Sequence, residues 1–236
     1  MNIRYLGHSG FIVETGQAYY LFDYIRGELP QMREGKPLYI FASHGHEDHF
    51  DFRILESPLS DRAEAILLGT DIRRTKKRKL ESFPESVKKK IIWAVAEQEI
   101  ALSSGTVLPL KSTDAGAAFV VTEADGTALY HAGDLNWWHW EGEAHSWNRN
   151  MEVRFKREID RLAGRHFQAA FLPLDPRQED AYDYGMDYFL GKVRVDHVFP
   201  MHFWEQYDII RKYKETHPVS DSKICFIEKE NEDYEI

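Results

Sequence analysis

The run SHGHEDHF occupies residues 43–50 and gathers four potential metal ligands, His44, His46, Asp48 and His49, within six residues. Neutral imidazole nitrogen and carboxylate oxygen are the usual protein ligands of zinc, manganese and iron. In an extended loop, alternate side chains point the same way, so His44 and His46 can hold one ion while Asp48 and His49 reach another. The run therefore predicts a centre for one or two divalent metal ions.

Strand-like segments precede this run. IRYLG, GFIVET, AYYLFDY and PLYIFAS are hydrophobic stretches between turn signals, which predicts consecutive strands. The last of them ends at Ser43, directly before the ligand cluster. The cluster is therefore expected on a loop at the C-terminal end of a strand, where a rigid sheet can present ligands.

The rest of the chain alternates between helical and strand-like patterns. Residues 50–90 are helical and charged around a predicted buried strand at 63–70, AEAILLGT. Strand-like runs return in IIWAV, EIALSSGTVLPL, AAFVVTEADG and TALYHAGD, with a turn expected at Asp125-Gly126. A helix over 144–163, strands in QAAFLPLD and VDHVFPMH around a helix near 180–191, and a final helix and strand SKICFIE follow. This order predicts an α+β fold with two packed sheets and helices outside.

Composition places the chain among ordinary globular proteins. Its 236 residues are 43% hydrophobic and 29% charged, which suits one domain spanning 1–236. A net charge of -9 argues against a surface coated by nucleic acid. Cys225 is the only cysteine, the N-terminus lacks the pattern of a secretory signal, and no apolar stretch approaches 18 residues. We therefore expect a cytoplasmic protein without a membrane partner.

At the SHGHEDHF run the sequence resembles the metallo-β-lactamase superfamily, which implies a four-layer αββα sandwich with the active site along one edge of the sheets. Asp134 in YHAGDLN matches the aspartate that bridges both metals, and His202 in FPMHF matches the late histidine of the second site. His8 in LGHSGF and Asp23 in LFDY match positions near the site in the branch that includes ascorbate-6-phosphate lactonases and N-acyl-phosphatidylethanolamine phospholipase D enzymes. The matches span nearly the whole chain.

One position departs from the family pattern, which normally supplies another histidine between the first cluster and the bridging aspartate. The only histidine between His49 and Asp134 is His131, which lies too close to Asp134 to be that ligand. The matching stretch is LKSTDAG, so Asp114, Thr113 or a water stands in for the histidine. The histidines make zinc the first expectation, whereas an oxygen ligand at this position favours harder ions, so manganese and iron are alternatives.

These ligands imply hydrolysis, because a divalent ion lowers the pKa of a bound water to about 7. Asp48 and Asp134 can accept a proton from the attacking water. His131 and His139 are candidates for the acid that protonates the leaving group, and each is equally well explained as a structural histidine. The sequence therefore predicts a metal-dependent hydrolase acting on a small ester-like, lactone or phosphodiester substrate.

The segment LNWWHWEGEAHSWN holds four tryptophans directly after the bridging aspartate: Trp137, Trp138, Trp140 and Trp147. They either form a wall for the substrate or cover the core beneath a long loop.

Nine lysines and arginines between Arg73 and Lys90 form a basic run, which is either a solvated helical face or an attractor of a phosphorylated or nucleic-acid substrate. An RNA- or DNA-processing nuclease is therefore one alternative, although a small-molecule substrate, phosphorylated or not, is favoured over nucleic acid. A non-catalytic metal-binding protein of the same fold is the other. The oligomeric state is left open, and the acidic end EKENEDYEI is expected to be a frayed tail.

Overall fold

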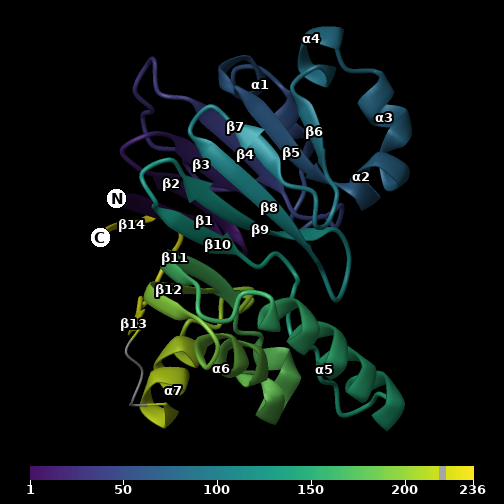
Figure 1. The fold of residues 1–236 in the computed structure, drawn as a ribbon, viewed down its shortest axis with the longest axis vertical. Coiled ribbons are helices and arrows are strands. Elements are labelled where there is room, and N and C mark those ends of the chain that lie inside the picture. The colour runs from purple at the N-terminus through teal and green to yellow at the C-terminus, as the bar shows by residue number, and fades with distance from the viewer. Residues whose placement is uncertain (218–221) are drawn as a thin grey trace.

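The computed structural model describes residues 1–217 and 222–236, and within them two sheets of seven strands each pack together (Figure 1). In spatial order the first sheet contains β14 (Glu232–Glu235), β1 (Asn2–Gly7), β2 (Gly10–Glu14), β3 (Tyr19–Phe22), β4 (Leu38–Ala42), β5 (Ala65–Gly69) and β6 (Ile91–Ala94). The second contains β13 (Lys223–Ile224), β12 (Arg194–Met201), β11 (His166–Pro173), β10 (Ala128–His131), β9 (Ala117–Glu123), β8 (Gly105–Lys111) and β7 (Ile100–Leu102).

Helices lie on the outer side of each sheet (Figure 1). Beside the first sheet are η1 (Phe52–Leu55), α1 (Leu59–Arg62), α2 (Thr70–Thr75), α3 (Lys77–Glu81) and α4 (Glu85–Lys88). Beside the second are α5 (His145–Asp160), η2 (Pro176–Ala181), α6 (Tyr184–Leu190) and α7 (Asp208–Thr216). The predicted α+β fold with αββα layers is confirmed.

Alternation along the strands divides the first sheet into two hydrophobic faces. In β2, Phe11 and Val13 belong to the core between the sheets, whereas Ile12 packs under helices α1–α4 with Ile54 and Ile72. Successive side chains of a strand point to opposite faces, so a strand covered on both sides needs hydrophobic residues throughout. This explains why the early strands read as unbroken hydrophobic runs.

The predicted segments map onto the observed elements with small shifts. The four strands expected before the ligand run are β1 to β4, and Gly126, with a φ of 92°, lies in the turn between β9 and β10. The run EIALSSGTVLPL forms two antiparallel strands, β7 and β8. The helix expected near residues 180–191 is divided between η2 and α6.

The prediction of a frayed acidic tail is wrong. β14 pairs antiparallel with β1, and the Arg4 guanidinium donates two hydrogen bonds of 2.7 Å to the Asp233 carboxylate. The Met1 amino group also donates to the backbone oxygen of Ile236 at 2.7 Å, so the two termini lie side by side (Figure 1). The prediction took the acidic composition as a sign of disorder. An edge strand, however, needs only hydrogen bonds to its neighbour and tolerates charges on its exposed side chains.

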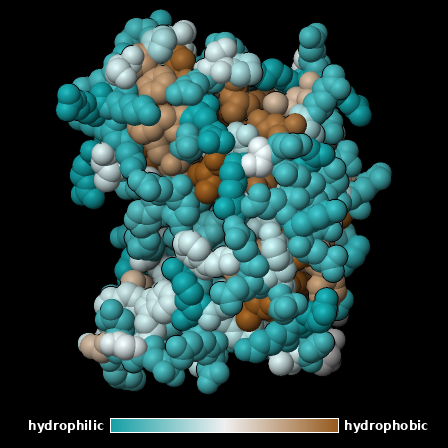
Figure 2. Space-filling view, turned by 180° about the vertical axis from the view of Figure 1, so that it is seen from behind, coloured by the Kyte–Doolittle hydropathy of each residue, from teal (hydrophilic) through white to brown (hydrophobic). Residues whose placement is uncertain are grey.

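Hydrophilic residues cover most of the face in Figure 2, while hydrophobic side chains gather mainly in its upper half. Among the described residues, every helix is too short or too polar to cross a bilayer.

Candidate metal centre

The predicted ligand run starts where the buried strand β4 ends, and hydrogen bonds fix its first residue. The Ser43 backbone N–H and hydroxyl each donate to the Asp23 carboxylate at 2.7 Å, and the Ala117 N–H donates to the Ser43 carbonyl at 3.0 Å. The loop then turns instead of staying extended, with the Phe50 N–H bonded to the His46 carbonyl at 2.9 Å. His44 therefore projects from a fixed point at the end of the sheet.

Two sets of potential ligands form in the described part of the chain. Each contains four side chains whose donor atoms lie within 4.8 Å of one another: His44, His46, Asp114 and Asp134 in the first set, and His8, Asp48, His49 and His202 in the second. The turn thus separates His44 and His46 from Asp48 and His49, which is the pairing that the sequence predicts.

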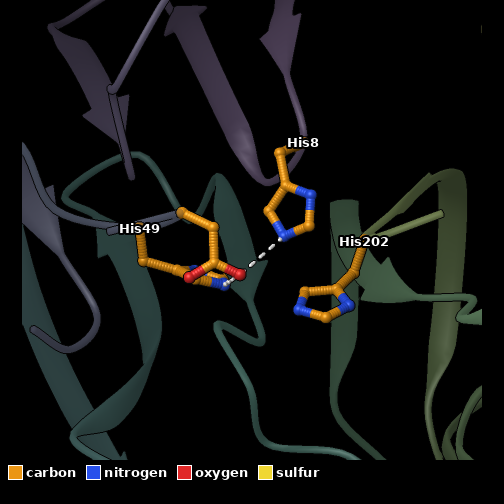
Figure 3. Close-up of side chains that lie close together, drawn as sticks. His8, His49 and His202 are labelled. Atoms are coloured by element: carbon orange, nitrogen blue, oxygen red, sulfur yellow. Dashed lines mark ion pairs between the residues drawn. The ribbon is translucent and has the colours of Figure 1, made fainter. Parts of the chain in front are cut away.

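The second set joins parts of the chain that are far apart in sequence. Figure 3 shows the rings of His8, His49 and His202 turned toward one another from three separate segments. His8 lies between β1 and β2, and its Nε2 is 3.3 Å from Asp48 Oδ2. His202 follows β12, and its ring centroid is 4.4 Å from that of His8.

Asp134 connects the two sets, because its two carboxylate oxygens face different histidines. Oδ2 is 3.4 Å from Nε2 of His44, in the first set. Oδ1 is 3.1 Å from Nε2 of His49 and 3.4 Å from Nε2 of His202, both in the second. A carboxylate in this position can bind two neighbouring ions at once.

Buried polar atoms without an aligned hydrogen bond fit a divalent cation at this centre. Among the described residues, His8 Nε2, His49 Nε2 and Asp134 Oδ1 are buried and lack an aligned hydrogen bond. An unpartnered buried polar atom costs about 1–3 kcal/mol, so three at one centre call for a ligand that satisfies them. Imidazole nitrogens and carboxylate oxygens fit a divalent metal ion.

Two buried carboxylates hold the ligand histidines from behind. Asp23 accepts a 2.7 Å hydrogen bond from His49 Nδ1, and Asp175 accepts a 3.0 Å bond from His202 Nδ1. Such bonds fix the ring and leave Nε2 free for a metal. Asp23 was expected near the site, but Asp175 was not, although its position in LPLD at the end of a predicted strand was a usable signal.

Burial and neighbouring charges shift the pKa values of the centre's histidines and carboxylates in opposite directions. Burial lowers the pKa of a histidine, yet the carboxylates of Asp134 and Asp23 outweigh it and hold the pKa of His49 well above its usual range. Burial raises the pKa of a carboxyl, yet His49 overcomes this and holds the pKa of Asp134 well below its usual range. Burial lowers the pKa of His8 and His44, which favours the neutral rings that bind metals.

Asp114, one of the candidates predicted to stand in for the family's histidine, belongs to the first ligand set. Its Oδ2 is 3.6 Å from His46 Nδ1. The hydroxyl of Thr113 instead donates to the backbone oxygen of Asn136 at 2.7 Å and so supports the loop after Asp134. Of the two protein candidates, Asp114 is the one whose side chain joins the ligand set.

Neither of the two candidate acids belongs to a ligand set. His131 is fully buried, its Nε2 is 2.9 Å from the Ser9 carbonyl, its Nδ1 accepts from the Gly133 N–H at 3.2 Å, and its ring stacks on Phe22. His139 contacts the ring of Tyr184 on α6. The structural interpretation of His131 therefore fits this geometry better than a catalytic role.

A pocket of about 290 Å³ opens onto the metal centre. Its lining includes His46, Asp48, Asp114, Asp134 and His202, together with Trp138, Trp140, Trp147, Met151, Arg177 and Trp204. The tryptophan segment is divided between the core and the pocket. Trp137 packs against Tyr184 and Tyr188, whereas Trp140 and Trp147 face the pocket.

The basic run forms α2, α3 and α4, and the described residues that line the metal-site pocket include none of its nine cations. Arg73 lies over the Trp93 ring at 5.7 Å, and Lys79 lies over Phe52 at 3.9 Å. Asp71 connects this region to the ligand loop, because its Oδ2 accepts from the Gly45 N–H at 2.8 Å. The run thus packs behind the loop and not beside the pocket.

A family model described as a beta-lactamase superfamily domain matches residues 2–139. A curated protein from Methylacidiphilum infernorum, named a metal-dependent hydrolase, is 36% identical over 74 residues, which are 29% of this chain. The match spans only 31% of that relative's length.

Two solved structures are similar over almost their whole length. Igni18, a metallo hydrolase from the archaeon Ignicoccus hospitalis, has a TM-score of 0.63 at 17% identity, covering 100% of this chain and 98% of that one. An isothiocyanate hydrolase from Delia radicum gut bacteria has a TM-score of 0.62 at 12% identity, covering 100% of this chain and 99% of that one. At these identities the likeness shows a shared fold.

Proposed function

The chain belongs to the beta-lactamase superfamily, and we propose that it is a metal-dependent hydrolase acting on a small ester-like, lactone or phosphodiester substrate. The observation that carries this proposal is Asp134, whose two oxygens face His44 on one side and His49 with His202 on the other. The names of the similar proteins support the same reaction class.

Two divalent ions fit the two ligand sets, with zinc as the first candidate. The second set offers three imidazoles and one carboxylate, a combination that zinc accepts. The first offers two imidazoles and two carboxylates, which also suits manganese or iron. When bound, such ions would supply an acidic water and polarise the substrate oxygen.

The residues of the chain orient these groups and move the proton. Asp23 and Asp175 hold His49 and His202 in place through Nδ1. Asp48 lines the pocket and its side chain is 30% exposed, so its Oδ2 is placed to accept the proton of the attacking water. Asp134 is almost fully buried and keeps its charge for the ions.

We further propose membership of the lactonase and phospholipase D branch, which the position of His8 in the second ligand set supports. A cytoplasmic location is also proposed. It is supported by the single cysteine, Cys225, which cannot form a disulfide within the chain.

The test combines elemental analysis with a hydrolysis screen. Purified wild-type protein should hold at least one zinc, manganese or iron ion per chain and hydrolyse one of three chromogenic classes: esters, lactones or phosphodiesters. Asp134→Asn should lose metal and at least about a hundredfold in activity, because it removes one charged bridging oxygen. Asp208→Asn, at an exposed aspartate on α7, is the matched control and should behave as wild type.

Two results would contradict the proposal in different ways. A protein that holds no metal and gains none on addition cannot use this mechanism. A protein that binds metal through Asp134 but hydrolyses none of the three classes is a non-catalytic metal-binding protein.

A further inference from the structure

We propose that the pocket over the metal centre selects substrates whose non-reacting part is a flat, uncharged aromatic ring. The ring would lie against a tryptophan wall, defined as Trp138, Trp140, Trp147 and Trp204. This inference rests on the proposed function for the reaction itself, but the wall can be tested separately by binding.

The size of the pocket limits the substrate. At about 290 Å³ it is slightly smaller than most small-molecule sites, which measure roughly 300–1,000 Å³. The carboxylates of Asp48 and Asp134 line the same small space as the tryptophan wall. A bond held at the metal centre therefore leaves room for about one ring against the wall.

The wall presents aromatic surface that the protein leaves uncovered. Trp204 is 40% exposed, and Trp140 and Trp147 are half-buried, although all three line the pocket. Trp138 and Trp140 stack with ring centroids 5.8 Å apart and planes 4° apart. Indole surface that stays partly exposed in a concave site favours a flat apolar ligand, because binding removes apolar surface of both partners from water.

Hydrogen bonds connect the wall to the metal centre. Trp138 Nε1 donates to the backbone oxygen of Asp134 at 3.1 Å. Trp204 Nε1 donates to Asp175 Oδ2 at 3.4 Å, and the same oxygen is 3.0 Å from His202 Nδ1. One carboxylate thus positions both a metal ligand and a side of the pocket.

Arg177 makes the wall rigid. Its guanidinium carbon lies 4.3 Å from the ring centroid of Trp204 and 5.8 Å from that of Trp140. Asp175 holds the guanidinium through bonds of 2.6 Å from Nη2 and 3.0 Å from Nε. Aromatic side chains that are already fixed lose little entropy when a ligand binds, so the wall is preorganised.

The charge distribution favours an uncharged ring. Asp175 already pairs with Arg177, the cation of the pocket lining, and the remaining charged lining groups include the carboxylates of Asp48, Asp114 and Asp134. An anionic substituent directed at the wall would find no unpaired cation among the lining residues described. Charge on the substrate is therefore expected only at the reacting group.

The test compares two methyl esters that differ only in the shape of the ring, methyl phenylacetate and methyl cyclohexylacetate. Their reacting groups are the same, and acid release is followed by titration at constant pH. Wild type should favour the phenyl ester by about tenfold in kcat/KM, mostly through KM, since ring stacking adds to simple burial. Trp204→Leu should remove most of this preference, and Trp204→Phe should restore part of it.

Trp93→Leu is the matched control, because Trp93 lies on β6 in a different pocket, under Arg73. It should keep the full preference. Binding of the two matching N-methyl amides, measured by calorimetry with zinc-loaded protein, gives a readout that needs no turnover.

The outcomes separate the two proposals. Hydrolysis without a ring preference, or a preference that survives Trp204→Leu, would overturn the aromatic pocket and leave the hydrolase intact. A third outcome is that neither ester is hydrolysed, while the phenyl amide binds selectively and Trp204→Leu removes this selectivity. It would support the aromatic pocket and contradict only the proposed hydrolysis of such esters. Equal or absent binding of both amides would overturn the pocket.

Discussion

Backbone strain is concentrated around the metal centre. Among the described residues, eight non-glycine residues have a positive φ, and five of them are His8, Asp23, His202, Trp204 and Glu205. Each such residue costs of order 1–3 kcal/mol and persists only where the surrounding contacts hold it. His8 and His202 belong to the second ligand set, and Asp23 holds the ligand His49. The strained residues are therefore those whose side-chain direction matters for the centre.

Gly116 lies where the backbone passes so close to the ligand loop that a side chain would not fit. Gly116 has a φ of 64°, and a Cβ there would meet the Ser43 carbonyl oxygen and lie 2.7 Å from the Cβ of His44. Gly164 has a similar φ of 78°, but nothing lies within 4 Å of its added Cβ. Comparing substitutions at Gly116 and Gly164 therefore separates the free-energy cost of a positive φ from the cost of displacing the ligand loop.

Gly116→Ala is expected to lower the free energy of unfolding by roughly 2–5 kcal/mol, because strain and a steric clash add. Gly164→Ala should cost about 1 kcal/mol, for the strain alone. Urea denaturation measures both values, and the metal content of Gly116→Ala should fall because His44 is displaced. Equal costs for the two variants would show that the close contact with Ser43 is unimportant.

At the scale of elements, the centre is built from the carboxyl ends of parallel strands. β3, β4 and β5 run parallel in the first sheet, and Asp23 and the ligand run follow the first two of them. β10, β11 and β12 run parallel in the second, and Asp134, Asp175 and His202 follow them in turn. The carboxyl ends of parallel strands lie at the same edge of a sheet, so the residues that follow these strands come together at that edge.

Tertiary contacts also hold the loop that leads into β4. Glu14, at the end of β2, accepts hydrogen bonds of 2.9 Å from Lys36 Nζ and from the Tyr19 hydroxyl. The hydrogen bond from Lys36 lowers the pKa of Glu14 to about 2. A carboxyl with a lowered pKa stabilises the fold above its unfolded pKa, near 4.5, and loses this contribution as the pH falls toward 2.

Glu14→Gln should therefore destabilise the protein at pH 7 by about 0.2–1 kcal/mol and by less as the pH falls from 4.5 toward 2. Chemical denaturation across this range measures the difference. Glu143→Gln, at an exposed glutamate, is the control and should leave the stability profile unchanged. A difference between wild type and Glu14→Gln that stays constant down to pH 2 would contradict the assigned pKa.

For the whole molecule, one hydrophobic core connects the two sheets. Phe11 of β2 lies 4.5 Å from Phe171 of β11, and Phe41 of β4 lies 5.1 Å from Phe119 of β9, both measured between ring centroids. The metal centre also draws ligands from both sheets. These shared contacts support the proposal that residues 1–236 form a single domain.

A single domain should unfold in one cooperative transition. Urea denaturation followed by far-ultraviolet circular dichroism and by tryptophan fluorescence should give coincident curves with and without zinc. Two separate transitions in metal-free protein would show that the halves fold independently.

The sequence alone identified much of the centre because its signals are local. His44, His46, Asp48 and His49 are adjacent in the chain, and the hydrophobic runs around them predict most of the strands. The family resemblance added Asp134 and His202 from short motifs.

Other features depended on contacts between distant residues, and only the tertiary structure decided them. The turn between β1 and β2 brings His8 into the second ligand set, and the order of the parallel strands brings Asp175 behind His202. The division of the tryptophans between core and pocket and the pairing of β14 with β1 have the same origin. Strand register and sheet packing determine these neighbours, and no local pattern of residues encodes either.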